Sequence, residues 1–252
     1  GAGIQADLKT FASLGAFGTS AITSITAQNL EGVRSIQPIK TEIVKDQIEA
    51  VFEGFKVAAV KTGMLFSREI IKQVAESMRK YEIENFVIDP VFAATSGSRL
   101  IEDEGIEALT KELFPLAKVI TPNIPEAEFL TGIKISNREQ MAKALEDLNK
   151  RYPGSVFVLK GGHLEDAAID IYGGKTIAVN ELKSEKVEGV NNHGSGCTFA
   201  SAVAAFLARG YEVEESLSLA KNFISGALRN SLSLEGGINL IDHFWRSDKG
   251  IH

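Results

Sequence analysis

Two kinds of apolar segment alternate along most of the chain. Short runs rich in β-branched residues are typical of buried strands, whereas longer stretches with apolar positions three or four residues apart are typical of helices. The pattern predicts strands at 57–60, 86–88, 119–121 and 156–159, and helices at about 41–53, 67–80, 103–113 and 136–151. Strands that alternate with helices form βαβ units, so we expect a mainly parallel sheet with helices on both faces.

The last third of the chain departs from this alternation. Gly173 and Gly174 separate the alternating runs 169–172 and 176–179, which predicts a β-hairpin near one edge of the sheet. Helical spacing then returns at about 195–209, 213–230 and 239–246. Because the sequence contains no repeat and no linker, we expect residues 1–252 to form one domain.

Composition narrows the class of protein. The chain has 252 residues, of which 27 are basic and 33 acidic, and a single cysteine. One cysteine cannot form a disulfide within the chain, and the four histidines lack the spacing of a zinc site. The sequence has no basic stripe of the kind that binds nucleic acid, and no apolar run of the roughly 18 residues that span a membrane. We therefore expect a reduced, cytoplasmic protein that binds small molecules.

The segment 191–210 carries the strongest functional signal. Gly194 and Gly196 flank Ser195 at the start of an expected helix, where backbone N–H groups and the helix dipole favour an anion. These three residues predict an anion hole. Cys197 follows in the first helical turn, where the same field is expected to lower the pKa of its thiol. An isolated cysteine is more often a small buried hydrophobe, but the neighbouring glycines favour the functional interpretation.

A second motif follows the strand expected at 119–121. Asn123 and Glu126 are three residues apart, so both side chains can face one site beyond the end of the strand. A carboxylate and an amide suit a hydrated Mg²⁺ and the oxygens of a phosphate. The same pair also suits a helix capping box, and the local sequence leaves both interpretations open.

Two further charged residues lie at expected strand ends. Lys160 precedes Gly161 and Gly162 and suits a nucleotide phosphate, with an ordinary surface lysine as the alternative. Asp89 precedes Pro90 and is a candidate acid near a metal, or a turn residue. Ligands of open parallel sheets bind beyond the carboxyl ends of the strands, where all these groups would meet. Phosphoryl transfer, which depends mainly on positioning and charge stabilisation, needs such a set.

Six motifs, in order, resemble one enzyme family. They are GAGIQADLKTFASLGAFGTSAITSITAQN at the start, VKTGML at 60–65, VIDPV at 87–91, TPNIPEAE at 121–128, KGGH at 160–163 and HGSGCTF at 193–199. Together they resemble the hydroxymethylpyrimidine/phosphomethylpyrimidine kinases of thiamine biosynthesis, which belong to the ribokinase-like superfamily. The resemblance covers essentially the whole chain and implies a three-layer α/β/α ribokinase-like fold.

The resemblance also implies an activity. Members of the family transfer phosphate from ATP, with Mg²⁺, to the hydroxymethyl group of an aminopyrimidine, and then phosphorylate that monophosphate to the diphosphate. Dimers are common among relatives, so we expect a homodimer. A pyridoxal kinase is the alternative, because some relatives with the same glycine and cysteine motif phosphorylate pyridoxal. A non-catalytic sensor of pyrimidine phosphates is an alternative of another class.

The family pattern assigns roles to individual residues of the transfer site. Cys197 takes the position at which most ribokinase-like enzymes have an aspartate general base, beside the anion hole. Asn123 and Glu126 would form the motif for Mg²⁺ and phosphate. Lys160 would face the phosphates of ATP, and Asp89 would lie near the metal.

The same pattern assigns the pocket for the pyrimidine. Asp7 and Gln28 would form hydrogen bonds with the ring, and Ala2, Met64 and Val91 would line its pocket. An aminopyrimidine offers adjacent donors and acceptors, which a carboxylate and a primary amide can match. Without the resemblance, Asp7 and Gln28 are only polar residues of a helix and of a strand end.

The sequence departs from the family pattern in three places. Relatives usually begin with a strand and a Ser/Asp/Gly-rich turn before GAGIQAD, so we expect this strand to be missing here. Asn192 and Ser195 replace the usual threonines, although Ser195 keeps a hydroxyl group. The segment 94–97 replaces a loop in which many relatives have a lysine, so a lysine contact with phosphate is not expected from this loop.

Overall fold

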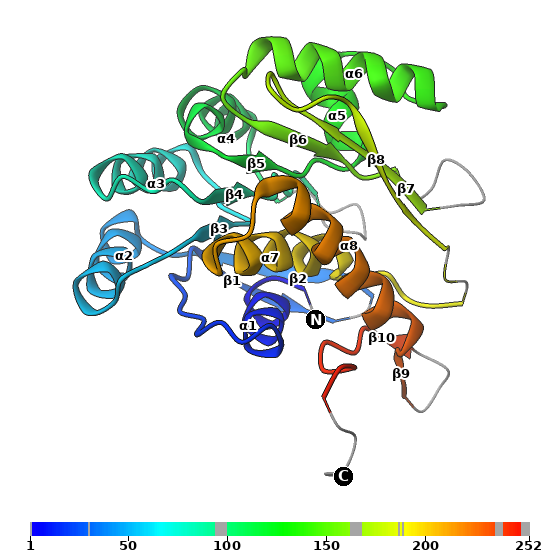
Figure 1. Cartoon of the computed structure of the whole chain (residues 1–252). Coiled ribbons are helices and arrows are strands. Elements are labelled where there is room, and N and C mark those ends of the chain that lie inside the picture. The colour runs from blue at the N-terminus through cyan, green and yellow to red at the C-terminus, as the bar shows by residue number, and fades with distance from the viewer. Residues whose placement is uncertain are drawn as a thin grey trace.

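A six-stranded sheet forms the centre of the molecule (Figure 1). The structure is a computed structural model that describes residues 2–29, 31–93, 100–161, 168–185, 187, 189–234 and 239–247. The strand order is β3 (Val60–Thr62), β4 (Phe86–Ile88), β5 (Val119–Ile120), β6 (Val156–Leu159), β7 (Ala168–Gly173) and β8 (Asn180–Ser184). The first four strands are parallel, and β7 and β8 extend the sheet in antiparallel register.

Helices cover both faces of this sheet. One face packs against α2 (Thr41–Gly54), α3 (Arg68–Lys80), α4 (Asp103–Ala108), α5 (Ile124–Thr131) and α6 (Arg138–Arg151). A π-helical turn (Leu109–Leu113) and a 3-10 turn (Phe114–Leu116) continue α4. The opposite face packs against α1 (Ile4–Ser13), α7 (Ser195–Ala208) and α8 (Val213–Arg229). The three layers confirm the predicted α/β/α fold class.

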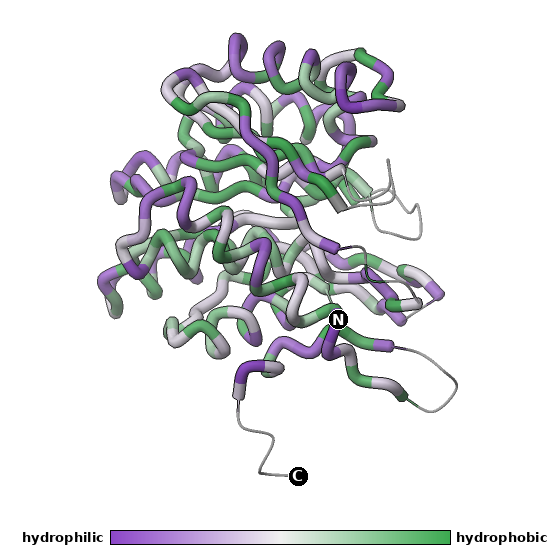
Figure 2. The backbone as a smooth tube through the Cα atoms, turned by 45° about the vertical axis from the view of Figure 1, so that its right-hand side comes forward, coloured by the Kyte–Doolittle hydropathy of each residue, from purple (hydrophilic) through white to green (hydrophobic). Residues whose placement is uncertain are grey.

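Successive side chains of a strand point to opposite faces of the sheet and so belong to two separate cores. In β4, Phe86 and Ile88 belong to the core under α2 to α6, whereas Val87 belongs to the core under α7 and α8. All three side chains are fully buried. Hydrophobic strands accordingly lie inside, and hydrophilic stretches follow the outer helices (Figure 2). Strands buried on both faces explain why these segments are continuously apolar in the sequence.

Two short antiparallel pairs lie outside the main sheet. They are β1 (Ser24–Gln28) with β2 (Val33–Pro38), and β9 (Leu232–Ser233) with β10 (Asn239–Leu240). Hydrogen bonds fix the segment before β1: the Gln47 side chain of α2 bonds both the N–H and the C=O of Ile22, at 2.9 and 3.0 Å. The Thr23 hydroxyl donates to the carbonyl oxygen of Met64 at 2.7 Å. These contacts hold the β1–β2 pair beside the carboxyl end of β3.

Most predicted elements are confirmed to within a few residues, with three corrections. The strand expected at 57–60 begins only at Val60. The predicted hairpin exists, but its second strand is β8 rather than 176–179, because Gly174 and Ile177 close a turn through two mutual backbone hydrogen bonds. The prediction of a helix at 239–246 is wrong, because this segment forms a short strand followed by turns.

The apolar residues of that last segment serve a different structure. β10 pairs with β9, and the Asp242 carboxylate accepts a hydrogen bond from the Phe244 N–H in the turn that follows, at 2.9 Å. Ile241 and Trp245 pack into the core under α7 and α8. Tertiary packing therefore produces the helix-like spacing. Among the described residues, no helix is both long enough and apolar enough to span a membrane.

Candidate active site

The carboxyl ends of the parallel strands border one large cavity of about 2050 Å³. A pocket for one small ligand is roughly 300–1000 Å³, so the cavity has room for two substrates. It is lined by all the residues that the sequence assigns to a site: Ala2, Asp7, Gln28, Met64, Asp89, Val91, Asn123, Glu126, Lys160, Gly194, Ser195, Gly196 and Cys197. The fold therefore brings the two predicted groups of residues to one place.

The start of α7 lies against an ion pair. A Cβ atom at Gly196 would be 3.2 Å from Lys160 Nζ and 3.7 Å from Asp89 Oδ2, so the lack of a side chain lets both groups approach the helix. Backbone N–H groups at a helix start carry partial positive charge. The Ser195 N–H already donates to the carbonyl oxygen of Asn192 at 3.0 Å, so the predicted anion hole would use the other backbone N–H groups at this helix start.

Lys160 and Asp89 form this ion pair inside the cavity. Lys160 Nζ lies 2.8 Å from Asp89 Oδ1, which also accepts a hydrogen bond from the Thr121 hydroxyl at 3.1 Å. Burial alone would raise the pKa of Asp89, but Lys160 and Lys61 outweigh it and lower this pKa. Burial alone would lower the pKa of Lys160, but Asp89 and Glu126 raise it. Both groups are therefore charged at neutral pH, and Lys160 is not a surface lysine.

Asn123 and Glu126 form a capping box at the start of α5. The Asn123 side chain accepts from the Glu126 N–H at 2.9 Å, and Glu126 Oε2 accepts from the Asn123 N–H at 2.8 Å. Glu126 Oε1 accepts from the Phe92 N–H at 3.2 Å. The capping interpretation is thus confirmed. It leaves the second interpretation open, because each carboxylate oxygen retains a lone pair beside the cavity.

The electrostatics of Glu126 favour a nearby cation. Its carboxyl group is buried, and burial together with the charge of Asp89 raises its pKa, although Lys160 opposes the rise. The buried carboxylates of Asp89 and Glu126 thus both interact with Lys160, beyond the carboxyl ends of β4 and β5. Among the described residues, no group of three or more His, Cys, Asp or Glu side chains could hold a metal by itself. A cation here would take its remaining ligands from a substrate or from water.

Cys197 lies in the first turn of α7 and is half-buried. Burial raises the pKa of its thiol; Lys61 opposes this rise, whereas Asp89 and Asp7 add to it. The lowering of this pKa predicted from the helix field is therefore wrong, because loss of water and two nearby carboxylates act more strongly. Cys197 is a thiol at neutral pH.

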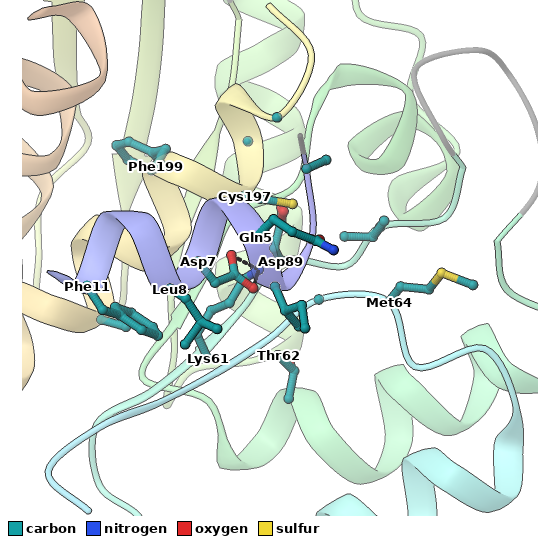
Figure 3. A pocket seen from close by; sticks show the side chains of 18 of the residues that line it. Gln5, Asp7, Leu8, Phe11, Lys61, Thr62, Met64, Asp89, Cys197 and Phe199 are labelled. Carbon is teal, nitrogen blue, oxygen red and sulfur yellow. Dashed lines mark hydrogen bonds and ion pairs between the residues drawn. The ribbon is translucent and has the colours of Figure 1, made fainter. Parts of the chain in front are cut away.

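Lys61, to which no sequence motif assigned a role, lies at the centre of the site (Figure 3). Its Nζ is 2.8 Å from Asp7 Oδ1 and 3.0 Å from Oδ2, and the Ser201 hydroxyl donates to Oδ1 at 2.6 Å. Burial alone would lower the pKa of Lys61, but Cys197, Asp7 and Asp89 raise it. One signal was available in the sequence, because a lysine inside a short apolar strand needs a buried anion as partner.

The residues predicted to line the ring pocket border the same cavity as this ion pair. Met64 and Val91 are half-buried on the segments after β3 and β4, and Ala2 precedes α1. Gln28 is exposed at the end of β1. Met64 lies apart from Asp7, across the cavity (Figure 3). The segment 94–97, as well as Gly162 and His163 of the KGGH motif, lies outside the described residues.

The chain is similar to one protein family over nearly its whole length. The family profile described as Phosphomethylpyrimidine kinase matches residues 1–242. The hydroxymethylpyrimidine/phosphomethylpyrimidine kinase of Rhizobium meliloti is 42% identical over 98% of this chain and 93% of its own length. A thiamine biosynthesis bifunctional protein of Geobacter sulfurreducens is 43% identical over 96% of this chain, which spans only about half (49%) of that protein.

Solved structures show the same relationship. A phosphomethylpyrimidine kinase from Clostridium difficile is 47% identical, with a TM-score of 0.79 over 90% of this chain and 93% of that one. A pyridoxal kinase from Staphylococcus aureus, solved with AMP-PCP and pyridoxal, is 32% identical, with a TM-score of 0.86 over 99% of this chain and 91% of that one.

Proposed function

The chain belongs to the phosphomethylpyrimidine kinase family, and we propose that it phosphorylates hydroxymethylpyrimidine and then its monophosphate, for thiamine biosynthesis. Its family membership makes it an ATP-dependent phosphotransferase. The observation that carries the proposal is the meeting of Lys160 and Asp89 with the start of α7 at Gly196. Such a site offers positive charge and backbone donors to a phosphate beside a pocket for a small acceptor.

We assign the γ-phosphate of ATP to the space between the start of α7 and Lys160. Phosphoryl transfer passes through a loose transition state in which charge spreads over the equatorial oxygens. The side chain of Lys160 is only 18% exposed and is charged, so its interaction with those oxygens is little screened by water. The Asp89 partner holds the lysine in place when no phosphate is bound.

Mg²⁺ suits the pair Asp89 and Glu126. Both are buried carboxylates, and burial together with the charge of Asp89 raises the pKa of Glu126, an effect that a bound cation would oppose. Mg²⁺ commonly binds through one or two carboxylates plus substrate phosphates and water. When bound, the ion neutralises charge on the β- and γ-phosphates. The amide of Asn123 would then orient a phosphate oxygen or a water molecule.

We assign Cys197 to the acceptor hydroxyl. The hydroxyl oxygen bonds to the γ-phosphorus as the bond to ADP breaks, and the hydroxyl proton leaves late, to a phosphate oxygen or to water, because a loose transition state needs little prior loss of this proton. A thiol can orient that hydroxyl by hydrogen bonding, which agrees with the raised pKa of Cys197. A direct role as proton acceptor is the alternative, and it would require Lys61 to stabilise the thiolate.

The ring of the acceptor would lie between Asp7 and Gln28, against Met64 and Val91. Asp7 offers carboxyl oxygens as acceptors for an N–H group of the ring, and Gln28 offers both a donor and an acceptor. Gln28 is exposed at the end of β1, so the β1–β2 pair would cover the ring. From the family resemblance we also propose that the protein assembles as a homodimer in the cytoplasm.

Pyridoxal is the second candidate acceptor. The Staphylococcus aureus pyridoxal kinase was solved with pyridoxal, and its fold matches this chain over 99% of its length. The sequence identity favours the pyrimidine, at 47% for the Clostridium difficile enzyme against 32% for the pyridoxal kinase. A sensor without catalysis is not favoured, because the chain retains Lys160, Asp89 and Cys197 together.

Specificity constants test the proposal. The values of kcat/KM would be compared for hydroxymethylpyrimidine, its monophosphate and pyridoxal, each with saturating ATP and Mg²⁺. We expect the pyrimidine to exceed pyridoxal by at least about tenfold, because a hydrogen-bonding site rejects rings that leave its polar groups unpaired. A preference for pyridoxal would replace this proposal with the second candidate.

A further inference from the structure

Asp7 is held by two partners from other parts of the chain. Lys61 of β3 contacts both carboxylate oxygens, at 2.8 and 3.0 Å, and Ser201 of α7 donates to Oδ1 at 2.6 Å. The side chain of Lys61 is only 3% exposed and that of Asp7 is 14% exposed, and Ser201 is fully buried. Asp7 is therefore fixed in orientation by these contacts, and it lines the cavity (Figure 3).

Most acceptor sites of this carboxylate are already occupied by Lys61 and Ser201. An ionised carboxylate has about four lone-pair sites, two on each oxygen. Lys61 and Ser201 occupy both sites on Oδ1, and Lys61 occupies one on Oδ2. One acceptor site on Oδ2 is left among the described contacts. We propose that Lys61 and Ser201 are positioning residues, which hold Asp7 as a single-acceptor recognition group for the ring of the phosphate acceptor.

This inference rests on the proposed function, because it takes Asp7 to face the ring. It adds a requirement: the ring must present one N–H or O–H donor to Oδ2. A ring with only acceptors at that position would leave a desolvated carboxylate oxygen unpaired, which is costly. An exocyclic amine meets the requirement. Lys61 also places a positive charge beside the site, so a cationic group on the ring would be disfavoured there.

A purely structural ion pair is the competing explanation. The same contacts join α1, β3 and α7, and a buried pair that loses one partner destabilises the fold. The two explanations differ in what they change. A structural pair affects thermal stability and all ligands alike, whereas a positioning pair affects the acceptor ring and leaves ATP binding unchanged.

The experiment measures binding by calorimetry together with turnover. Lys61→Met removes the charge, and Ser201→Ala removes one hydrogen bond while keeping the ion pair, so it is expected to fold. Lys118→Met is the matched control, because Lys118 is a partly buried lysine that contacts Asn85 at 2.7 Å just before β5. Hydroxymethylpyrimidine, pyridoxal and ATP are the ligands, and Tm is recorded for every variant.

We expect the Kd for hydroxymethylpyrimidine to rise about tenfold or more in Lys61→Met and about fivefold in Ser201→Ala. The Kd for ATP should stay within about twofold in both, and Lys118→Met should change neither. Equal changes for ring and nucleotide, or a lower Tm with an unchanged Kd for the ring in Ser201→Ala, would overturn the inference.

The result also separates this inference from the proposed function. If the wild type does not turn over the pyrimidine but the variants weaken ring binding selectively, the proposed function fails and the positioning role stands. If the pyrimidine is turned over normally and ring binding is unaffected in the variants, only the positioning role fails. A wild type that binds neither ring contradicts both.

Discussion

Opposing effects act on the pKa of the Cys197 thiol. The amino-terminal end of α7 favours a thiolate, whereas burial and the carboxylates of Asp89 and Asp7 favour the thiol. The second set is stronger, so the pKa is raised. A residue at the position of a general base can therefore serve by hydrogen bonding to the acceptor hydroxyl rather than by holding a negative charge in advance.

Substitutions of Cys197 separate hydrogen bonding from proton uptake. Cys197→Ser keeps a group that can orient the hydroxyl, and we expect its kcat within about tenfold of wild type. Cys197→Ala removes that group and should lower kcat about 100-fold, the usual scale for loss of one positioned acid–base group. Steady-state kinetics with saturating ATP measure both. An alanine variant with near-normal kcat would show that Cys197 has no role in transfer.

The burial of His243 predicts that the stability of the fold depends on pH. It is buried, and its Nε2 lies 3.0 Å from the hydroxyl of Thr198 at the start of α7. Burial and the charge of Lys9 lower the pKa of His243 from 6.5 to about 4. The unfolded chain therefore binds more protons between these two values, and stability falls as pH decreases from 6.5 to 4, by about 3 kcal/mol for this group.

The matched variant is His243→Gln, which keeps a polar side chain but does not titrate. Urea unfolding at pH 4.5, 5.5 and 7 should show a steeper loss of stability in wild type than in the variant. Parallel curves would mean that His243 titrates alike in the folded and unfolded chain.

At the scale of elements, hydrophobic spacing predicts the helices well. The helix expected at 67–80 is α3, whose start follows from Ser67 as N-cap for the Ile70 N–H. The segment 239–246 shows the limit of such spacing. Its first residues form β10, whose pairing with β9 depends on contacts with another segment that hydrophobic spacing does not reveal. The antiparallel β1–β2 pair was likewise not predicted.

Close packing makes Gly161, between β6 and the segment 162–167, sensitive to substitution. A Cβ atom there would collide with the carbonyl oxygen of Ile169 and lie 2.8 Å from Met141 Cε. Because Gly161 adjoins Lys160, Gly161→Ala should lower the free energy of unfolding by about 2 kcal/mol and also raise the KM for ATP. Gly154→Ala is the control, since no heavy atom lies within 4 Å of its Cβ position.

Urea unfolding and ATP titration check this pair of variants. We expect Gly154→Ala to behave like wild type in both measurements. If Gly161→Ala also had the stability and the KM for ATP of wild type, the backbone beside Lys160 would be free to move. The fixed position assigned to that lysine would then be wrong.

At the scale of the whole molecule, the active site depends on contacts between distant parts of the sequence. Asp7 meets a partner 54 residues away in Lys61 and another 194 residues away in Ser201. Motifs after strands predicted where Asp89, Glu126 and Lys160 would lie, because parallel topology brings strand ends together. No local pattern specifies that a lysine within β3 pairs with a carboxylate of α1, so this part of the site required the structure.

We propose that this cavity transfers phosphate from ATP to a pyrimidine. The most direct measurement incubates the protein with ATP, Mg²⁺ and hydroxymethylpyrimidine and quantifies ADP and pyrimidine phosphates together by mass spectrometry. We predict one ADP per monophosphate at first, followed by diphosphate with a second ADP. ADP formation that does not depend on the pyrimidine, or bound pyrimidine without any phosphorylated product, would contradict the account.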